Sequence, residues 1–477
     1  MSVLRSSFGV ECEFMVCIQE EHTNVATPEL FALSTGGPII VPPLTSQYDI
    51  IKQTIDEVTR TFKGSRVCDT FNPAKDPEAF HLTNAGDWNV EEEFSLSMPA
   101  EILQQEHMRS YTWAAIEVQS PALWVEEDSF EEIHRVISAI REKYWVYTPR
   151  TAGLHVHYGV GKHYIPLPQL RRIAALTFAA DPILTQLHPP HRRENNEFCR
   201  SNRLYTRLAH GRDGDPIAQN TSQRIEVDEV ESPPETPEHP INTAPRRKTR
   251  RRPRTQRAPG FKSVFRRGTL DGYTFSAEHY RATRNAALGD NMDEPARPLP
   301  MLYGVAQLLS CANAPTLAEL MSWSNGVSYR PAYNFRAYDK GVYRAAGHFR
   351  TVEFRQMAAT LDPDVVVAHA SVVARLCEWA GNADLRAFWK TVLDCRTGAE
   401  IDPKMFDVFD LLTDLGLVDE AAVLQRDVAR WKGVEVPDAP GEPAAGRYQH
   451  RGWAARLNGD SSVHCRFRKY TCLVSKL

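Results

Sequence analysis

Gly9-Val10-Glu11-Cys12-Glu13-Phe14 is the stretch of sequence that decides the fold. Apolar and ionisable residues alternate along it, and successive side chains of a β-strand point to opposite faces of a sheet. Glu11 and Glu13 would therefore share one face, while the apolar residues around them point to the other. The pattern predicts a strand with one side in a core and an acidic side facing away from it.

Three further stretches repeat this alternation with other ionisable residues. They are Ala115-Ile116-Glu117-Val118-Gln119, Leu154-His155-Val156-His157-Tyr158 and Val352-Glu353-Phe354-Arg355. If the four strands belong to one sheet, their polar side chains line one face and their apolar side chains line the other. The expected fold class is therefore α+β, with a mostly antiparallel, curved sheet that has one polar face and carries helices on its apolar face.

The predicted polar face concentrates negative charge. Two carboxylates on one strand face lie about 7 Å apart, and their repulsion costs roughly 2 kcal/mol at an effective dielectric constant of about 20. Divalent cations would remove this cost, and oxygen ligands with an occasional imidazole suit Mg²⁺ or Mn²⁺. A lone Glu-x-Glu pair would also fit an exposed strand face, and a lone His-x-His pair would fit two partly buried histidines. The metal interpretation depends on all four carboxylates: Glu11, Glu13, Glu117 and Glu353.

Glu353 and Arg355 add a second kind of chemistry to this face. They place a carboxylate ligand beside a guanidinium, the group that best matches the oxygens of a phosphate. Metal ions and an arginine on one face predict phosphoryl transfer, in which charge neutralisation and alignment do most of the catalysis. The chain has neither a P-loop nor a glycine-rich dinucleotide fingerprint. We therefore expect metals and the sheet to hold the nucleotide.

Length and composition narrow the class of protein. A chain of 477 residues suggests two or three average domains, or one large catalytic domain with an insertion. The net charge of −4 gives no sign of a nucleic-acid partner, and no apolar stretch reaches the ~18 residues that would span a membrane. Nine cysteines without a C-x-x-C pair indicate a reducing compartment. We expect a cytoplasmic protein with neither a membrane nor nucleic acid as partner.

Two segments have compositions typical of disorder. Residues 212–262 are acidic and proline-rich and then strongly basic around residues 246–254, so we expect a disordered charged insertion. The basic run alone would also fit a nuclear-localisation or nucleic-acid-binding patch. Residues 434–477 are predicted to be a disordered tail. It ends in Ser475-Lys476-Leu477, a peroxisomal address, so peroxisomal delivery is the alternative to cytoplasmic residence.

The patterned parts of the chain give the remaining organisation. We expect a catalytic domain over residues 5–211 and 263–380, and a helical extension over residues 381–433. Helical spacing of apolar residues predicts helices at 46–62, 167–187, 300–323 (interrupted near Pro315), 365–379, 383–393, 403–415 and 419–431. Ser129-Phe130-Glu131-Glu132 has the sequence of a capping box, which predicts that a helix begins after Ser129.

The four strand stretches, in this order, resemble the signature strands of the amidoligase family. The resemblance covers roughly residues 5–380 without the insertion. This family is similar to glutamate–cysteine ligase and glutamine synthetase, in the carboxylate–amine ligase superfamily. The resemblance implies a glutamine synthetase-like catalytic fold, in which a sheet cradles ATP and two or three Mg²⁺ ions.

The resemblance also implies roles for individual residues. His157, Asn334 and Arg355 would bind the nucleotide, and Arg355 and Glu353 would be catalytic. Glu93 stands where the family usually has aspartate, and Phe94 where it has a small residue, so the role of Glu93 is left open. The implied metal ligands are Glu11, Glu13, Glu117, His155 and Glu353.

From these observations we expect an ATP-dependent carboxylate–amine ligase that forms an amide or peptide bond through an acyl phosphate. Its substrates would be small-molecule or peptide carboxylates and amines, whose identity the sequence does not reveal. Two alternatives remain: a metal-dependent hydrolase built on His155 and His157, and a non-catalytic binding protein on the same scaffold. Four carboxylates with only two clustered histidines favour magnesium over zinc, and thus the ligase over the hydrolase.

Overall fold

The computed structural model describes part of the chain in detail. The described residues are 4–19, 36–42, 45–62, 66–70, 86–104, 111–193, 196–211, 263–272, 299–322, 330–340 and 350–435. The insertion predicted at 212–262 lies outside them. So do residues 436–477 of the predicted tail, which include Ser475-Lys476-Leu477.

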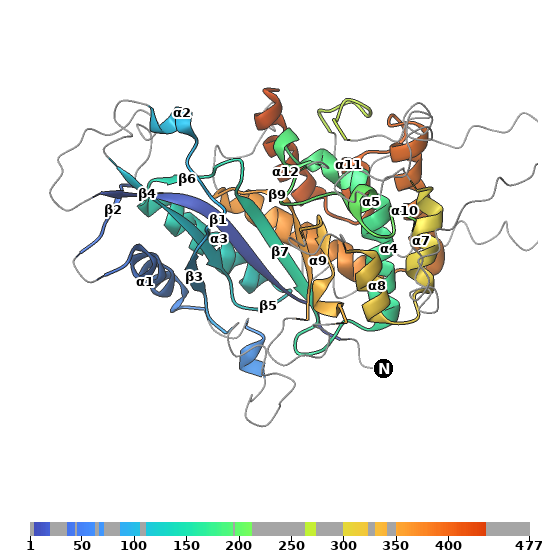
Figure 1. The fold of residues 1–477 in the computed structure, drawn as a ribbon, viewed down its shortest axis with the longest axis horizontal. Helices are drawn as coiled ribbons and strands as arrows, with labels where there is room; N and C mark the ends of the chain where they lie inside the picture. The colour runs from blue at the N-terminus through green and yellow to red at the C-terminus, as the bar shows by residue number, and fades with distance from the viewer. Residues whose placement is uncertain are drawn as a thin grey trace, which may run out of the picture.

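A nine-stranded open sheet forms the centre of the fold (Figure 1). Its main path is antiparallel throughout and runs in the order β3 (Asn89–Glu92), β4 (Thr112–Gln119), β1 (Ser7–Gln19), β7 (Gly153–Gly159), β9 (Val352–Ala358) and β8 (Tyr333–Asn334). Three short strands also pair with the long β1: β2 (Ile39–Ile40) in parallel, and β5 (Leu123–Trp124) and β6 (Val146–Tyr147) antiparallel. The mostly antiparallel sheet predicted from the alternating stretches is confirmed.

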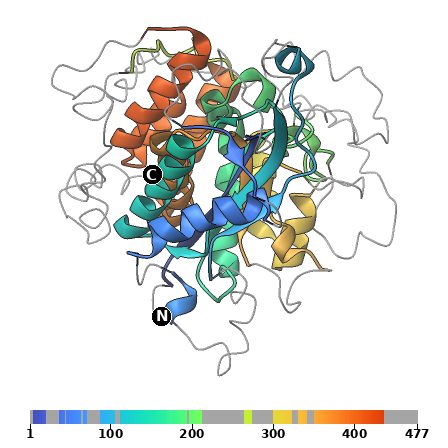
Figure 2. The ribbon, with the colours of Figure 1, turned by 90° about the vertical axis from the view of Figure 1, so that its left-hand side faces the viewer.

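Helices cover the apolar face of this sheet. The layer next to the strands consists of α1 (Gln47–Thr59), α3 (Glu127–Lys143) and α9 (Pro363–Asn382). Phe8 of β1 stacks on Phe130 of α3 with ring centroids 4.7 Å apart, and α1 and α3 lie side by side (Figure 2). The apolar residues that alternate with the ionisable ones are buried in this layer: Val10, Cys12, Ile116, Val118, Val156, Val352 and Phe354.

More helices pack behind α9. They are α4 (Leu167–Leu184), α7 (Met301–Ser310), α8 (Ala314–Leu320), α10 (Leu385–Arg396), α11 (Val408–Asp414) and α12 (Val418–Lys432). Gly304 lets α7 approach α4 closely, because a Cβ at this position would stand 2.2 Å from Phe178 Cε1. The short turns of helix are α2 (Ala100–Leu103), α5 (Asn202–Tyr205), η2 (Cys68–Thr70), η5 (Thr185–Leu187), η6 (Pro190–Arg192), η8 (Arg336–Tyr338) and η9 (Thr397–Ile401). None of the helices in the described part of the chain combines the length and the apolar character needed to cross a bilayer.

Most predicted helices are confirmed, including the interruption between α7 and α8. The helix predicted from residue 403 begins only at Val408, because the side chain of Asp407 accepts hydrogen bonds from the backbone of Phe409 and Asp410 and so caps α11 there.

The predicted capping box at Ser129 is wrong. Helix α3 begins at Glu127, so Ser129 lies within its first turn rather than before it. Glu132, the other member of the expected box, is buried and accepts a hydrogen bond of 2.9 Å from Trp88 Nε1. The motif fails because Glu132 serves a contact between α3 and the segment leading into β3, which local sequence does not reveal.

Candidate active site

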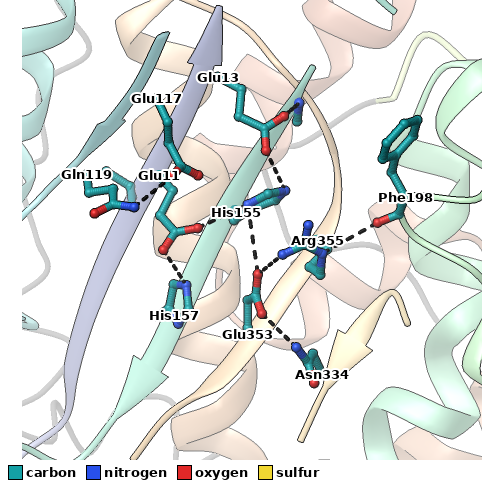
Figure 3. Close-up of polar contacts among 12 residues, drawn as sticks. Glu11, Glu13, Glu117, Gln119, His155, His157, Phe198, Asn334, Glu353 and Arg355 are labelled. Atoms are coloured by element: carbon teal, nitrogen blue, oxygen red, sulfur yellow. Dashed lines mark hydrogen bonds and ion pairs between the residues drawn. The ribbon is translucent and has the colours of Figure 1, made fainter. Parts of the chain in front are cut away.

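The strands of the main path bring the predicted polar side chains together on one face of the sheet (Figure 3). Residues directly opposite one another on neighbouring strands share a face. The opposed pairs are Glu11–His155, Glu13–Glu117, His157–Glu353 and Asn334–Glu353. The polar face predicted from four separate stretches therefore exists, and β1 lies in the middle of it.

Glu11 lies between the two histidines of β7. Its Oε2 is 3.1 Å from His155 Nδ1, and its Oε1 is 3.1 Å from His157 Nε2. Burial alone would raise the pKa of Glu11, but the charge of His157 and hydrogen bonds from both histidines hold that pKa well below its ordinary value. Glu11 is therefore ionised at neutral pH.

His155 is buried and contacts carboxylates on both sides. Its Nδ1 faces Glu11, and its Nε2 is 3.5 Å from Glu13 Oε1. The other oxygen of Glu13 accepts a hydrogen bond of 2.6 Å from the backbone N–H of Gly153. A Cβ at position 153 would stand 2.8 Å from His155 Nε2 and 2.7 Å from Arg192 Nη2, so any other residue would displace one of these two side chains. The glycine of the Gly-x-His-x-His stretch thus makes room for its own histidine.

His157 bonds to a hydroxyl on its other side. Its Nδ1 is 3.0 Å from Thr351 Oγ1. Burial lowers the pKa of His157, but the charge and hydrogen bond of Glu11, with a further contribution from Glu353, raise it to about 9. His157 is therefore a cation at neutral pH and offsets part of the negative charge of the face.

Glu117 has the opposite character. Burial, followed by the charge of Glu11 and then those of Glu13 and Glu93, raises the pKa of Glu117 to about 8, although Gln119 Nε2 donates to its Oε2 at 2.7 Å. A carboxyl group in this state holds a proton through much of the neutral range. A cation bound here would displace that proton.

Glu353, Arg355 and Asn334 form a connected group at the other end of the face (Figure 3). Arg355 Nη1 donates to Glu353 Oε1, and Asn334 Nδ2 donates to Glu353 Oε2 at 2.8 Å. Burial would raise the pKa of Glu353, but the charge of Arg355, followed by those of the two histidines, lowers it. Arg355 Nε also donates to the carbonyl oxygen of Phe198 at 3.4 Å, a long hydrogen bond.

A β-bulge separates this group from the rest of β9. The register pairs Leu154 with Met357 and Val156 with Phe354. Both Arg355 and Gln356 therefore lie opposite His155. Gln356 is buried, and its Nε2 donates to Thr185 Oγ1 at 2.6 Å. The bulge leaves the carbonyl oxygen of Arg355 to accept a hydrogen bond of 2.6 Å from Arg192 Nη2.

Among the described residues, three sets of side chains could each hold a cation, because in each set three ligand atoms lie within 4.8 Å of one another. The sets are Glu11–Glu117–His155, Glu11–His157–Glu353 and Glu13–Glu93–Glu117. All five predicted metal ligands take part. His157, predicted to bind nucleotide, joins the second set, and Glu93, whose role was open, joins the third. Glu11 and Glu117 each belong to two sets, so neighbouring cations would share carboxylates.

Gln119 and Arg192 are among the contributors to the site that were not predicted. Gln119 continues the alternation that begins at Glu117, so the sequence did contain a signal for it. Arg192 reaches the face from η6, in a stretch with no strand periodicity, and nothing in its local sequence indicates this position.

No curated protein matches the chain in sequence. Residues 5–207 carry β1, β4 and β7, and with them Glu11, Glu13, Glu117, His155 and His157. It is this part of the chain, residues 5–207, that matches the sequence model of a family described as "putative amidoligase enzyme".

Proposed function

We propose that this protein is an ATP-dependent carboxylate–amine ligase, which forms an amide or peptide bond through an acyl phosphate. One observation carries the proposal: a guanidinium, that of Arg355, stands beside three overlapping sets of carboxylate and imidazole ligands on one sheet face. The family match over residues 5–207 supports a ligase. Strand β9, which lies outside the match, contributes the Glu353–Arg355 pair.

The donor atoms of the site fit Mg²⁺ or Mn²⁺. Each ligand set contains at least two carboxylates, and the hard oxygen ligands outnumber the imidazoles. Glu11, Glu13, Glu93, Glu117, His155, His157 and Glu353 would hold the ions. Bound ions would neutralise the phosphate oxygens of ATP and the charge that develops on the transferred group.

Arg355 would stabilise the phosphoryl group from the side of β9. Its charge is fixed, because burial lowers the pKa of Arg355 but the charges of Glu353, Glu11 and Glu13 more than restore it. Glu353 and, through Glu353, Asn334 hold the guanidinium in place before substrate binds. Such preorganised charge is worth more than a mobile one, since no reorganisation is needed during the reaction.

The proposed chemistry needs no covalent bond to the protein. A carboxylate oxygen of the acid substrate would attack the γ-phosphorus of ATP, and ADP would leave. The nitrogen of the amine substrate would then attack the acyl carbon, losing a proton as inorganic phosphate leaves. The polar face would align ATP, the acid and the amine, and its bound ions and Arg355 would screen their charges.

A screen for ADP release tests the proposal. The full-length protein with MgATP would be incubated with pools of amino acids, polyamines and short peptides, and the mass of any product determined. We expect ADP release that requires both an acid and an amine, and a product mass equal to their sum minus water. Hydrolysis of peptides or amides without ATP would instead support the metal-dependent hydrolase. Failure to bind MgATP at all would contradict the ligase, and failure to hydrolyse peptides or amides as well would leave a binding protein.

A further inference from the structure

Arg192 is a buried cation whose hydrogen bonds are largely unmet. It ends the turn η6, and its side chain is completely buried. Its Nη2 donates to the carbonyl oxygen of Arg355, but its Nε and Nη1 have no hydrogen-bond partner. Among the described residues no carboxylate forms an ion pair with it. A buried charge in this state is strongly unfavourable unless something else pairs with it.

In the described part of the chain, the buried Arg203 and the half-buried Arg267 do have such a partner. Arg203 Nη2 lies 2.7 Å from Glu400 Oε1 in an ion pair that is almost wholly buried. Arg267 makes two hydrogen bonds to Asp410, at 2.6 and 2.7 Å. Arg192 differs from both because its one hydrogen bond goes to a neutral carbonyl group. Within the described part of the chain, the fold thus leaves the charge of Arg192 available for an added anion.

The position of Arg192 indicates which anion this is. A Cβ at Gly153 would stand within 2.7 Å of Arg192 Nη2 and 2.8 Å of His155 Nε2, so the guanidinium lies beside the histidine of the polar face. The hydrogen bond from Arg192 Nη2 to the backbone carbonyl oxygen of Arg355 places the Arg192 guanidinium against the β9 bulge, where Arg355 lies. Outside β9, the guanidinium of Arg355 donates to the carbonyl oxygen of Phe198, at the long distance of 3.4 Å.

We propose that Arg192 and Arg355 form an oxyanion subsite at the β7–β9 side of the polar face, and that its ligand is a phosphoryl group. The inference rests on the proposed function, in which this group is the terminal phosphate of ATP. Guanidinium groups bind phosphate and carboxylate oxygens through a planar fork of N–H donors. A phosphoryl group suits two arginines better than a carboxylate does, because it offers three oxygens and a larger negative charge. Its oxygens would accept from Arg192 Nε and Nη1 and would replace the Phe198 carbonyl at Arg355.

Binding of inorganic phosphate to the full-length protein in EDTA tests the subsite without any need for catalysis. Isothermal titration would compare the wild type with Arg192→Met and Arg192→Lys. Arg172→Met is the matched control, because that guanidinium also donates to backbone carbonyls, those of Gly381 and Ala383, but away from the polar face. We expect the control to bind phosphate as the wild type does, and both Arg192 variants to bind at least about tenfold more weakly.

The lysine variant keeps the test decisive if the methionine variant fails to fold. Lysine retains the charge and can still donate to the Arg355 carbonyl, but it lacks the fork. Wild-type phosphate affinity in Arg192→Lys, or no phosphate binding by the wild type, would overturn the inference and leave Arg192 as a support of the bulge.

Titration with acetate at matched ionic strength tests whether the subsite binds a carboxylate rather than a phosphoryl group. If acetate binds as tightly as phosphate and its binding also depends on Arg192, the phosphoryl assignment is wrong. If acetate does not compete with phosphate, the assignment is supported. ADP release is measured separately, so Arg192-dependent phosphate binding without ADP release would sink the ligase proposal and leave the subsite standing.

Discussion

Glu13 of β1 and Glu117 of β4 lie directly opposite each other across a strand pair. Carboxyl groups in such positions repel one another when both are ionised. The structure avoids part of this repulsion, because burial and the surrounding carboxylates raise the pKa of Glu117 to about 8. A cation that binds at Glu13 and Glu117 would therefore displace the proton of Glu117.

The pKa of Glu117 predicts how stability depends on pH. The folded protein binds this proton more tightly than the unfolded chain, in which the pKa is about 4.5. The stabilisation is complete below the unfolded value and is lost as the pH rises toward 8. In EDTA the free energy of unfolding should therefore fall between pH 5 and pH 8. In Glu117→Gln this fall should be smaller, because glutamine does not ionise. At pH 8 the free energy of unfolding of the variant should be about 2 kcal/mol larger than that of the wild type.

Urea unfolding at the two pH values measures this effect. Glu91→Gln is the control, because Glu91 lies opposite Glu117 on β3 but is exposed. It should keep the wild-type dependence on pH. A Glu117→Gln protein with the same pH dependence as the wild type would show that another group is responsible.

The overlap of the ligand sets predicts the stoichiometry of metal binding. Glu11 belongs to two of the three sets and Glu93 to one. If each set holds one ion, Glu11→Gln should lose two sites and Glu93→Gln only one. The number of Mn²⁺ sites would be measured by titrating each protein with Mn²⁺ and following the free ion by electron paramagnetic resonance. MgATP should also stabilise the wild type, by about 2.7 kcal/mol at a hundredfold excess over its dissociation constant, and EDTA should abolish this effect.

A different pattern of losses would contradict the shared-ligand arrangement. Equal stoichiometry in Glu11→Gln and Glu93→Gln would mean that Glu11 does not bridge two ions. Gln119→Glu, which adds a carboxylate beside Glu117 without removing a ligand, should retain every site.

The polar face could be predicted from sequence because strand alternation depends only on neighbouring residues. Glu11, His155 and Glu353 were each placed on it from a local pattern. What local patterns could not reveal is where the strands meet and shift. The bulge opposite His155 and the approach of Arg192 depend on contacts between residues far apart in the chain. The failed capping box at Ser129 has the same cause, since the carboxylate of Glu132 serves a distant tryptophan.

Ser129 of α3 and Asp384 before α10 should differ in their contribution to stability, because only Asp384 caps its helix. Ser129 lies inside α3, and its buried hydroxyl has no hydrogen-bond partner, so Ser129→Ala should leave stability unchanged or raise it slightly. Asp384 is a true N-cap, since its side chain accepts from Ala387 N at 2.8 Å. Asp384→Ala should cost about 1 kcal/mol. Thermal unfolding of both variants checks this, and the reverse order of effects would restore Ser129 as the cap.

Asn202 is predicted to hold the edge strand β8 in place. Its Nδ2 donates to Tyr333 O and its Oδ1 accepts from Tyr333 N, both at 2.9 Å, as a neighbouring strand would. Asn202→Ala loses both hydrogen bonds at a buried position and should cost about 2–3 kcal/mol. Asn202→Asp keeps only the acceptor, so its stability should fall between those of the wild type and Asn202→Ala. Since Asn334 follows Tyr333, ADP release should decline in the same order. Full activity in a destabilised Asn202→Ala protein would separate β8 from the site.

The Glu353–Arg355 pair gives the sharpest test of the site. Glu353→Gln removes a carboxylate ligand and leaves the buried guanidinium of Arg355 without its anionic partner. We expect ADP release to fall about a hundredfold or more and the metal-free protein to lose about 2 kcal/mol of stability. Arg355→Lys should lower ADP release while leaving the number of Mn²⁺ sites unchanged, because arginine is not a metal ligand.

Arg336→Ala, which removes an exposed arginine from the neighbouring η8, serves as the control and should leave turnover near that of the wild type. Coupled-enzyme measurement of ADP and urea unfolding, done on the same preparations, separate the effect on turnover from the effect on folding. A Glu353→Gln protein that loses stability yet retains wild-type turnover would show that the pair is structural. The metal assignment at β9 would then be wrong, and the phosphoryl group would have to bind elsewhere on the polar face.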